Sequence, residues 1–151
     1  MGQIVTPVRG QPSELVPVLV RLRGAGAAAP LVEVGPNGEA PTASATAATN
    51  KTGVGISRAG AGDYTLTLAE RPGKFMGMTM GMGVSTPSAT TPRFVQYEED
   101  NAFTGTSNSI RLFHVTPSTD AAAAAASDMA STDVHTLVFW FRQHAINPPA
   151  G

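Results

Sequence analysis

The chain has 151 residues, a formal net charge of −1 and 14% charged residues, so it has the size of about one domain and no basic excess for a nucleic-acid partner. It contains no cysteine, which excludes disulfide bonds and thiolate metal sites. The sequence shows neither an apolar run of about 18 residues nor a signal-peptide order, so we expect no membrane partner and synthesis inside the cell. Its 16 glycines and 12 prolines leave little room for long helices, and we predict an all-β fold.

The first ten residues predict an extended apolar arm. They carry Ile4, Val5 and Val8, and Pro7 interrupts them because it cannot donate a hydrogen bond to a neighbouring strand. An apolar arm of this kind needs a partner surface.

A strand is predicted from Leu15 to Arg23, because two kinds of side chain alternate with a period of two. One face carries Val16, Val18, Val20 and Leu22, and the other carries Leu15, Pro17, Leu19, Arg21 and Arg23. Pro17 indicates a place near a sheet edge. Residues 40–52 have almost no side chain large enough to pack, so we predict a linker there. We therefore divide the chain into an N-terminal arm and attachment segment, 1–52, and a β-sandwich domain, 53–151.

The clearest hairpin joins the runs 54–58 and 64–68, which both alternate with a period of two. The loop 59–63 between them supplies glycines for positive φ angles. Tyr64, Leu66 and Leu68 are predicted to point into the core.

A methionine-rich strand is predicted from Lys74 to Gly83. One face carries Met76, Met78, Met80 and Met82, and glycines occupy much of the other. Two interpretations remain open. The methionines form an adaptable surface for a partner, or they belong to a core strand whose glycines admit a close neighbour.

The segment from Val134 to Arg142 is predicted to be the strand that organises the fold, because both of its faces are apolar. Leu137, Phe139 and Phe141 line one face, and Val138 and Trp140 line the other. Such a strand belongs in the middle of a covered sheet or at a subunit contact. About eight short strands are predicted in all, which favours a β-sandwich of the jelly-roll type with an extended N-terminal arm.

The sequence carries no catalytic or metal-binding signature. His114 and His135 lie in predicted strands without a partner at a ligand spacing, although Asp133 and His135 share a face. The adjacent acids 98–100 are typical of a solvated loop, and they lack the separation that a sugar-hydrolysing carboxylate pair needs. We therefore predict no enzyme activity, no metal and no cofactor, and we rank a small sugar-active jelly-roll enzyme last.

Three stretches together resemble small virion proteins of tailed bacteriophages. They are the hairpin Gly53–Leu68, the strand Ile110–Thr116, and the segment Asp128–His135 that runs into Leu137–Arg142. In that group a Gly-rich hairpin reading roughly R-x-G-x-G-x-Y-T-V-T-L precedes a strand, and an acidic turn leads into an aromatic strand that ends in Arg. The resemblance covers about residues 53 to 146, and it implies a trimeric β-sandwich.

The resemblance implies a capsid decoration (cement) protein, a head fibre or a spike. We favour a decoration protein, made in the host cytoplasm, that binds the major capsid protein on the outer surface of the capsid. A homotrimer would bridge capsid subunits through several weak contacts and stabilise the head. The residues expected at the capsid contact are Ile4, Val5, Val8, Leu15 and Leu19. Those expected at the oligomer contact are Met76, Met78, Met80 and Trp140. The alternative is a trimeric tail-fibre or spike tip that binds a host-surface receptor through the loops around 93–108.

Overall fold

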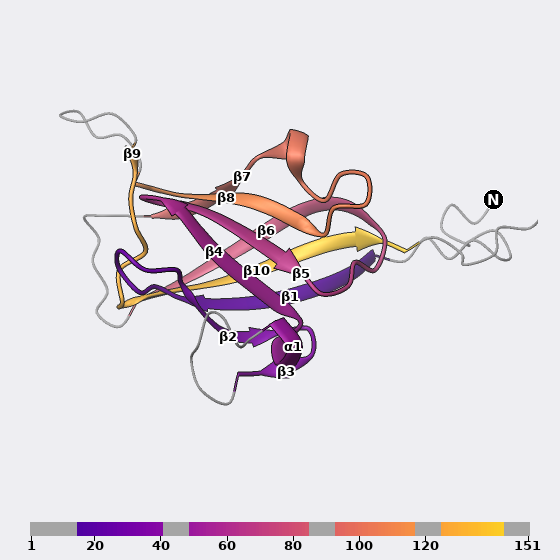
Figure 1. Ribbon diagram of the computed structural model, residues 1–151, viewed down its shortest axis with the longest axis horizontal. Helices are drawn as coiled ribbons and strands as arrows, with labels where there is room; N and C mark the ends of the chain where they lie inside the picture. The colour runs from indigo at the N-terminus through magenta and orange to yellow at the C-terminus, as the bar shows by residue number, and fades with distance from the viewer. Residues whose placement is uncertain (1–14, 41–48, 85–92, 117–124, 144–151) are drawn as a thin grey trace, which may run out of the picture.

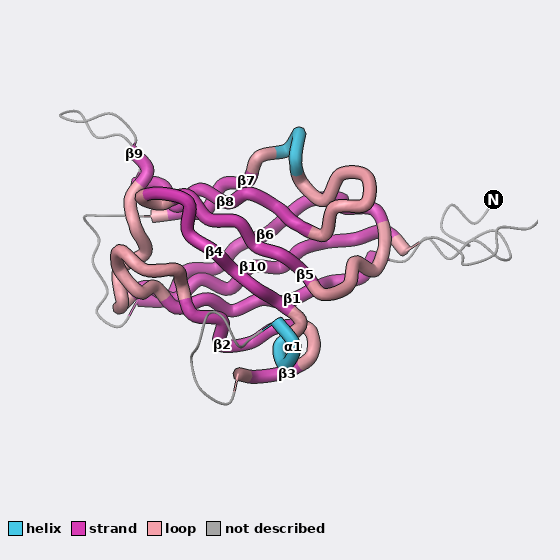
Figure 2. The backbone as a smooth tube through the Cα atoms, viewed as in Figure 1, coloured by secondary structure: helices cyan, strands magenta, loops and turns pink. Residues whose placement is uncertain are grey.

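The computed structural model describes residues 15–40, 49–84, 93–116 and 125–143. They form two antiparallel β-sheets packed face to face, so the predicted all-β sandwich is confirmed (Figure 1). Helical structure in these residues is confined to α1 (Thr49–Thr52) and the 3₁₀ turn η1 (Glu99–Asn101), as Figure 2 shows. None of the helices described is long and apolar enough to cross a membrane.

The chain crosses between the two sheets several times. The first sheet has the order β3-β2-β1-β10-β6, and the second has the order β4-β5-β8-β7 with β9 paired to β8. The strands of the first sheet are β1 (Leu15–Arg23), β2 (Leu31–Gly35), β3 (Gly38–Glu39), β6 (Lys74–Val84) and β10 (Asp133–Arg142). Those of the second are β4 (Val54–Gly60), β5 (Asp63–Leu68), β7 (Phe94–Tyr97), β8 (Ser109–Thr116) and β9 (Ala125–Ala126).

Strand β10 lies in the middle of the first sheet, as its two apolar faces predict. It pairs with β1 from Leu15↔Arg142 to Arg23↔Val134, and with β6 on its other side. Leu137, Phe139 and Phe141 are fully buried on the face that meets the second sheet.

The described part of the predicted N-terminal segment belongs to the same sandwich as the rest of the chain. Residues 15–40 supply three strands of the first sheet, and β1 pairs with β10 along its whole length. The boundary expected at residue 52 therefore does not separate two packing units among the described residues. Residues 1–14 and 41–48 lie outside the described part, so the arm and that part of the linker remain predictions. Residues 49–52, also expected in the linker, instead form α1, and Thr52 is fully buried.

Pro17 is accommodated because β1 has a neighbour on only one side at this position. Strand β2 pairs with β1 only from Arg21 to Arg23, so Pro17 faces β10 alone among the described strands. A missing N–H is tolerated on an open edge. The prediction of a near-edge position is confirmed for this half of the strand.

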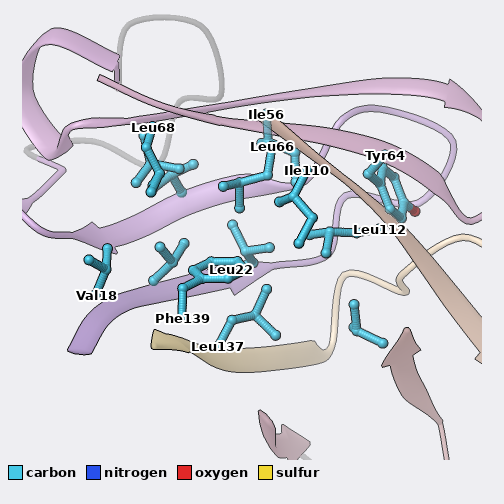
Figure 3. Close-up of a cluster of buried hydrophobic side chains, with 14 of the residues drawn as sticks. Val18, Leu22, Ile56, Tyr64, Leu66, Leu68, Ile110, Leu112, Leu137 and Phe139 are labelled. Carbon is cyan, nitrogen blue, oxygen red and sulfur yellow. The ribbon is translucent and has the colours of Figure 1, made fainter. Parts of the chain in front are cut away.

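The core is formed by apolar side chains that meet between the sheets. In Figure 3, Val18, Leu22, Leu137 and Phe139 of the first sheet face Ile56, Leu66, Leu68 and Ile110 of the second. Tyr64, Leu66 and Leu68 are buried, as predicted from their alternation.

The β4–β5 hairpin has a shorter loop than the sequence predicts. Strand β4 continues to Gly60 and β5 begins at Asp63, so only Ala61 and Gly62 make the turn. Gly62 has a φ of +66°, and a Cβ there would lie 2.6 Å from Ser127 N. The position therefore needs glycine for both its backbone angle and its packing.

Replacing Phe139 by alanine is expected to lower the free energy of unfolding by about 3–5 kcal/mol, because it removes a fully buried ring between the sheets. Phe113→Ala is the matched control. Phe113 is only partly buried on β8 and packs under the Arg111 guanidinium, so its loss should cost about 1 kcal/mol. Equilibrium urea unfolding followed by circular dichroism measures both, and equal losses would contradict this assignment of the core.

Candidate functional site

The outer face of the first sheet, turned away from the second sheet, carries large apolar side chains. Leu15, Leu19 and Met76 are 54%, 44% and 45% exposed, and they are the exposed large hydrophobic residues of the described part of the chain. We define the outer apolar face as these three residues with Pro17, Val138 and Trp140. Contiguous exposed apolar surface of this kind marks a protein contact more often than scattered single residues do.

Strand register brings these residues together from three strands. Pro17 lies opposite Trp140, and Leu19 lies opposite Val138. On the other side of β10, Trp140 lies opposite Gly77. The Trp140 Nε1–H donates a hydrogen bond of 3.2 Å to Thr79 Oγ1 of β6. The indole is therefore held against β6, and the face extends across β1, β10 and β6.

A β-bulge explains why Met76 is exposed. Trp140 pairs with Gly77 and Phe141 pairs with Phe75, so Met76 has no register partner on β10. Gly77 adopts a φ of +147°, which a residue with a side chain rarely adopts. The extra residue changes the alternation, and Met76 faces outward while Met78 and Met80 face inward.

Met78 and Met80 are partly buried and pack against the core. The Val95 N–H donates a hydrogen bond of 3.0 Å to Met80 Sδ. For these two residues the structure favours the core interpretation, so of the three methionines expected at an oligomer contact only Met76 is exposed. Ile4, Val5 and Val8 lie outside the described residues, and their assignment to a capsid contact remains a prediction.

Basic side chains stand at both ends of the outer apolar face. Arg21 and Arg23 lie at one end, where both donate hydrogen bonds to Glu33, the first at 2.9 Å. Lys74 and Arg142 are paired in register at the other end, and both are exposed. The face therefore has an apolar centre and a positively charged rim.

A second feature, the buried histidine cluster, is formed by His114 of β8 with Asp133 and His135 of β10. All three are buried, and one potential ligand atom of each lies within 4.8 Å of the other two. The two imidazole rings meet edge to face with centroids 5.1 Å apart. The sequence predicted that Asp133 and His135 share a face, but it did not predict that His114 of the other sheet lies beside them. The inward alternation of Ile110, Leu112 and His114 is the signal that could have done so.

Hydrogen bonds hold two members of this cluster. His114 Nδ1 is 2.6 Å from the Ser127 carbonyl oxygen. Asp133 Oδ2 accepts hydrogen bonds from Arg93 Nη1 at 2.6 Å and from the Ala130 N–H at 3.0 Å. Burial, together with the nearby His114 ring, lowers the pKa of His135 to about 4. Burial also lowers the pKa of His114.

No protein-family model, curated protein or solved structure matches this chain.

Asp128 ties the loop before β10 to the β4–β5 hairpin. Arg58 Nε and Nη2 donate to its two carboxylate oxygens at 2.8 and 2.9 Å, and the Gly62 N–H donates to it at 3.0 Å. The Tyr64 hydroxyl donates to Asp128 Oδ1 at 3.2 Å and accepts from the Met129 N–H at 3.0 Å. The Arg58 hydrogen bonds hold the pKa of Asp128 well below its usual value. These contacts join the hairpin Gly53–Leu68 to the segment that leads into β10.

Asp128→Asn removes the charge and keeps the shape, and it should lower the free energy of unfolding by about 1–3 kcal/mol at pH 7. Because folding lowers the pKa of Asp128 from 3.8, its contribution is complete above about pH 4 and is lost as the pH falls toward the lowered value. The difference in free energy of unfolding between wild type and variant should therefore become smaller below pH 4.

Urea unfolding of both proteins from pH 7 to pH 3 measures this difference. Asp63→Asn is the control, because it breaks a similar pair with Arg111 that is more exposed and worth about 0.2–1 kcal/mol. A difference for Asp128→Asn that stays constant from pH 7 to pH 3 would show that the folded chain does not hold this carboxylate in its ionised form.

Proposed function

We propose that this chain is a capsid decoration protein of a tailed bacteriophage, which binds the lattice of the major capsid protein on the outer surface of the head. The observation that carries the proposal is the outer apolar face of β1, β10 and β6. Leu15 and Leu19, expected at the capsid contact, share this face with Met76 and Trp140, expected at the oligomer contact, so the proposal assigns the whole face to the capsid. The resemblance of the hairpin and of the last strand to small phage virion proteins supplies the class of partner.

The shape of this face suits a protein partner better than a small ligand. It is the side of a β-sheet, and an added Cβ at Gly77 would meet no atom within 4 Å. A hollow lined by Arg21, Arg23, Gly81 and Thr136 lies at the Arg21 and Arg23 end of the sheet face, beyond the apolar centre. Small ligands prefer concave pockets that bury most of their surface. A broad apolar sheet face is complementary to another extended protein surface, and its burial contributes about 25 cal/mol per Å².

The charges around the face define the partner further. Lys74 and Arg142 stand at one end, and Arg21 and Arg23 share the single carboxylate of Glu33 at the other. A partner with an apolar centre and acidic side chains at its rim would match both ends. Rim charges mainly set orientation and the rate of association, while the apolar centre supplies most of the affinity.

Several copies of this contact would bind the capsid more tightly than a single copy. If three copies associate, each trimer presents three outer apolar faces to a lattice of identical sites, and binding of the first raises the effective concentration of the others. The predicted arm residues Ile4, Val5 and Val8 would add a further contact. Several weak contacts per trimer would then clamp neighbouring capsid subunits and stabilise the head.

The copy number of this chain in purified virions is the first test. Quantitative mass spectrometry with the major capsid protein as reference should find many copies per particle, at the fixed ratio of a lattice site. A few copies per particle would reject decoration and favour the fibre or spike tip. Absence from the particle would reject both.

A substitution within the face tests which surface makes the contact. Leu19→Asp should lower occupancy on the capsid at least about tenfold, because it places a charge in the apolar centre. Thr67→Asp is the matched control, since Thr67 is exposed on β5 of the second sheet. Co-sedimentation of each variant with heads that lack the protein measures occupancy, and circular dichroism checks folding. Equal occupancy of the two variants would show that another surface binds.

A further inference from the structure

The buried histidine cluster contains more unpaired polar atoms than a core normally tolerates. Three buried ring nitrogens, His114 Nε2, His135 Nδ1 and His135 Nε2, have no hydrogen-bond partner among the described residues. Each such atom has lost its hydration on burial without gaining a hydrogen bond in exchange. Buried polar groups in native proteins nearly always have a partner, so an orphaned group points to a bound ion or water.

The hydrogen bond of His114 fixes which of its ring nitrogens is free. The Ser127 carbonyl can only accept, so His114 Nδ1 must carry the proton and donate it over 2.6 Å. In the neutral ring, Nε2 then presents a bare lone pair. That atom lies 3.9 Å from Asp133 Oδ2. A lone pair and a carboxylate oxygen therefore face one another at a distance too long for a hydrogen bond.

A buried site in which two electron-pair donors face each other is suited to a cation that both of them bind. The geometry points to a binding site for a divalent transition-metal ion of the zinc class, with His114, His135 and Asp133 as its ligands. Imidazole nitrogen and carboxylate oxygen are the ligands that zinc takes where cysteine is absent.

The distances are close to those of a zinc site. Zinc binds nitrogen and oxygen at about 2.0–2.2 Å in a tetrahedron, so two of its ligand atoms lie roughly 3.4 Å apart. The three ligand atoms here lie within 4.8 Å of one another. The ligand atoms that lie farthest apart would have to approach each other by about 1.4 Å. His135 can turn either ring nitrogen toward the ion, because both are unpaired among the described residues.

The surroundings already orient two of the ligands. Metal-bound histidines usually donate their second ring N–H to a carbonyl or carboxylate, as His114 does to Ser127. Arg93 and the Ala130 N–H hold Asp133 through Oδ2. A carboxylate has about four lone-pair positions, so Asp133 can keep these bonds and still bind an ion.

A metal at this place would connect the two sheets. His114 comes from β8 of the second sheet, and Asp133 and His135 come from β10 of the first. The three ligands are buried, and a water would take the fourth position of the tetrahedron, as in other zinc sites with three protein ligands. The ion would bind the folded chain alone, so it would raise stability by mass action.

The test uses the full chain without a histidine tag, stripped of metal by a chelator. Equilibrium dialysis against Zn²⁺ with elemental analysis should find one bound ion per chain at micromolar free zinc. Co²⁺ should give the visible absorption bands of a tetrahedral nitrogen and oxygen site. Zn²⁺ should also raise the Tm by several degrees, and a chelator should reverse the rise. No binding in this range, or no change in Tm, would overturn the proposal and leave a buried neutral histidine pair.

Variants locate the ion. His114→Gln, His135→Gln and Asp133→Asn should each weaken Zn²⁺ binding at least about tenfold. Asp63→Asn should leave it unchanged, because it removes a carboxylate that pairs with Arg111 instead. Circular dichroism checks each variant, and the Co²⁺ spectrum of the wild-type chain decides the matter if a histidine variant does not fold. If all four variants bind Zn²⁺ as tightly as the wild-type chain, the ion lies elsewhere and the proposed site is rejected.

Discussion

The fold depends on burying the inner face of β10. Leu137, Phe139 and Phe141 form a fully buried row, and this row needs a second sheet as its cover. The strand also needs a neighbour on each edge, which β1 and β6 provide. Its other face carries Val138 and Trp140, which remain partly exposed because the second sheet covers only one side. One strand with two apolar faces thus requires the sandwich on its inner side and leaves apolar side chains exposed on its outer side.

The interior is divided into an aromatic end and a polar end. At the aromatic end Phe75, Phe103, Phe139 and Phe141 pack with ring centroids 5.2–6.4 Å apart. At the polar end the same two sheets enclose His114 and His135, with Asp133 beside them. Rings in contact supply apolar burial without polar atoms, whereas each polar group at the other end needs a partner. The apolar end therefore supplies stability, and the polar end offers a site.

The two proposals concern opposite sides of the same strand. Successive side chains of β10 alternate, so Asp133 and His135 point inward while Thr136 and Val138 point outward. A metal ion between the sheets would hold them together through inward-facing side chains of β10. A partner would contact the outward-facing side chains of the same strand. The two proposed sites share the backbone of β10 but no side chain. Either proposal can therefore be correct if the other is wrong.

The alternation of residues in the sequence determined which side chains share a face. It correctly grouped Leu15 with Leu19, placed Tyr64 and its neighbours in the core, and identified the segment ending at Arg142 as a central strand. Only the tertiary structure decided which faces meet. Leu15 pairs with Arg142, and His114 meets His135 across the sheets, through contacts between residues far apart in the chain. The bulge at Met76 reverses the alternation of β6, so the methionines that the sequence placed on one face are divided between two. Alternation is local, with a period of two residues, whereas register and bulges are set by long-range pairing that this local pattern does not encode.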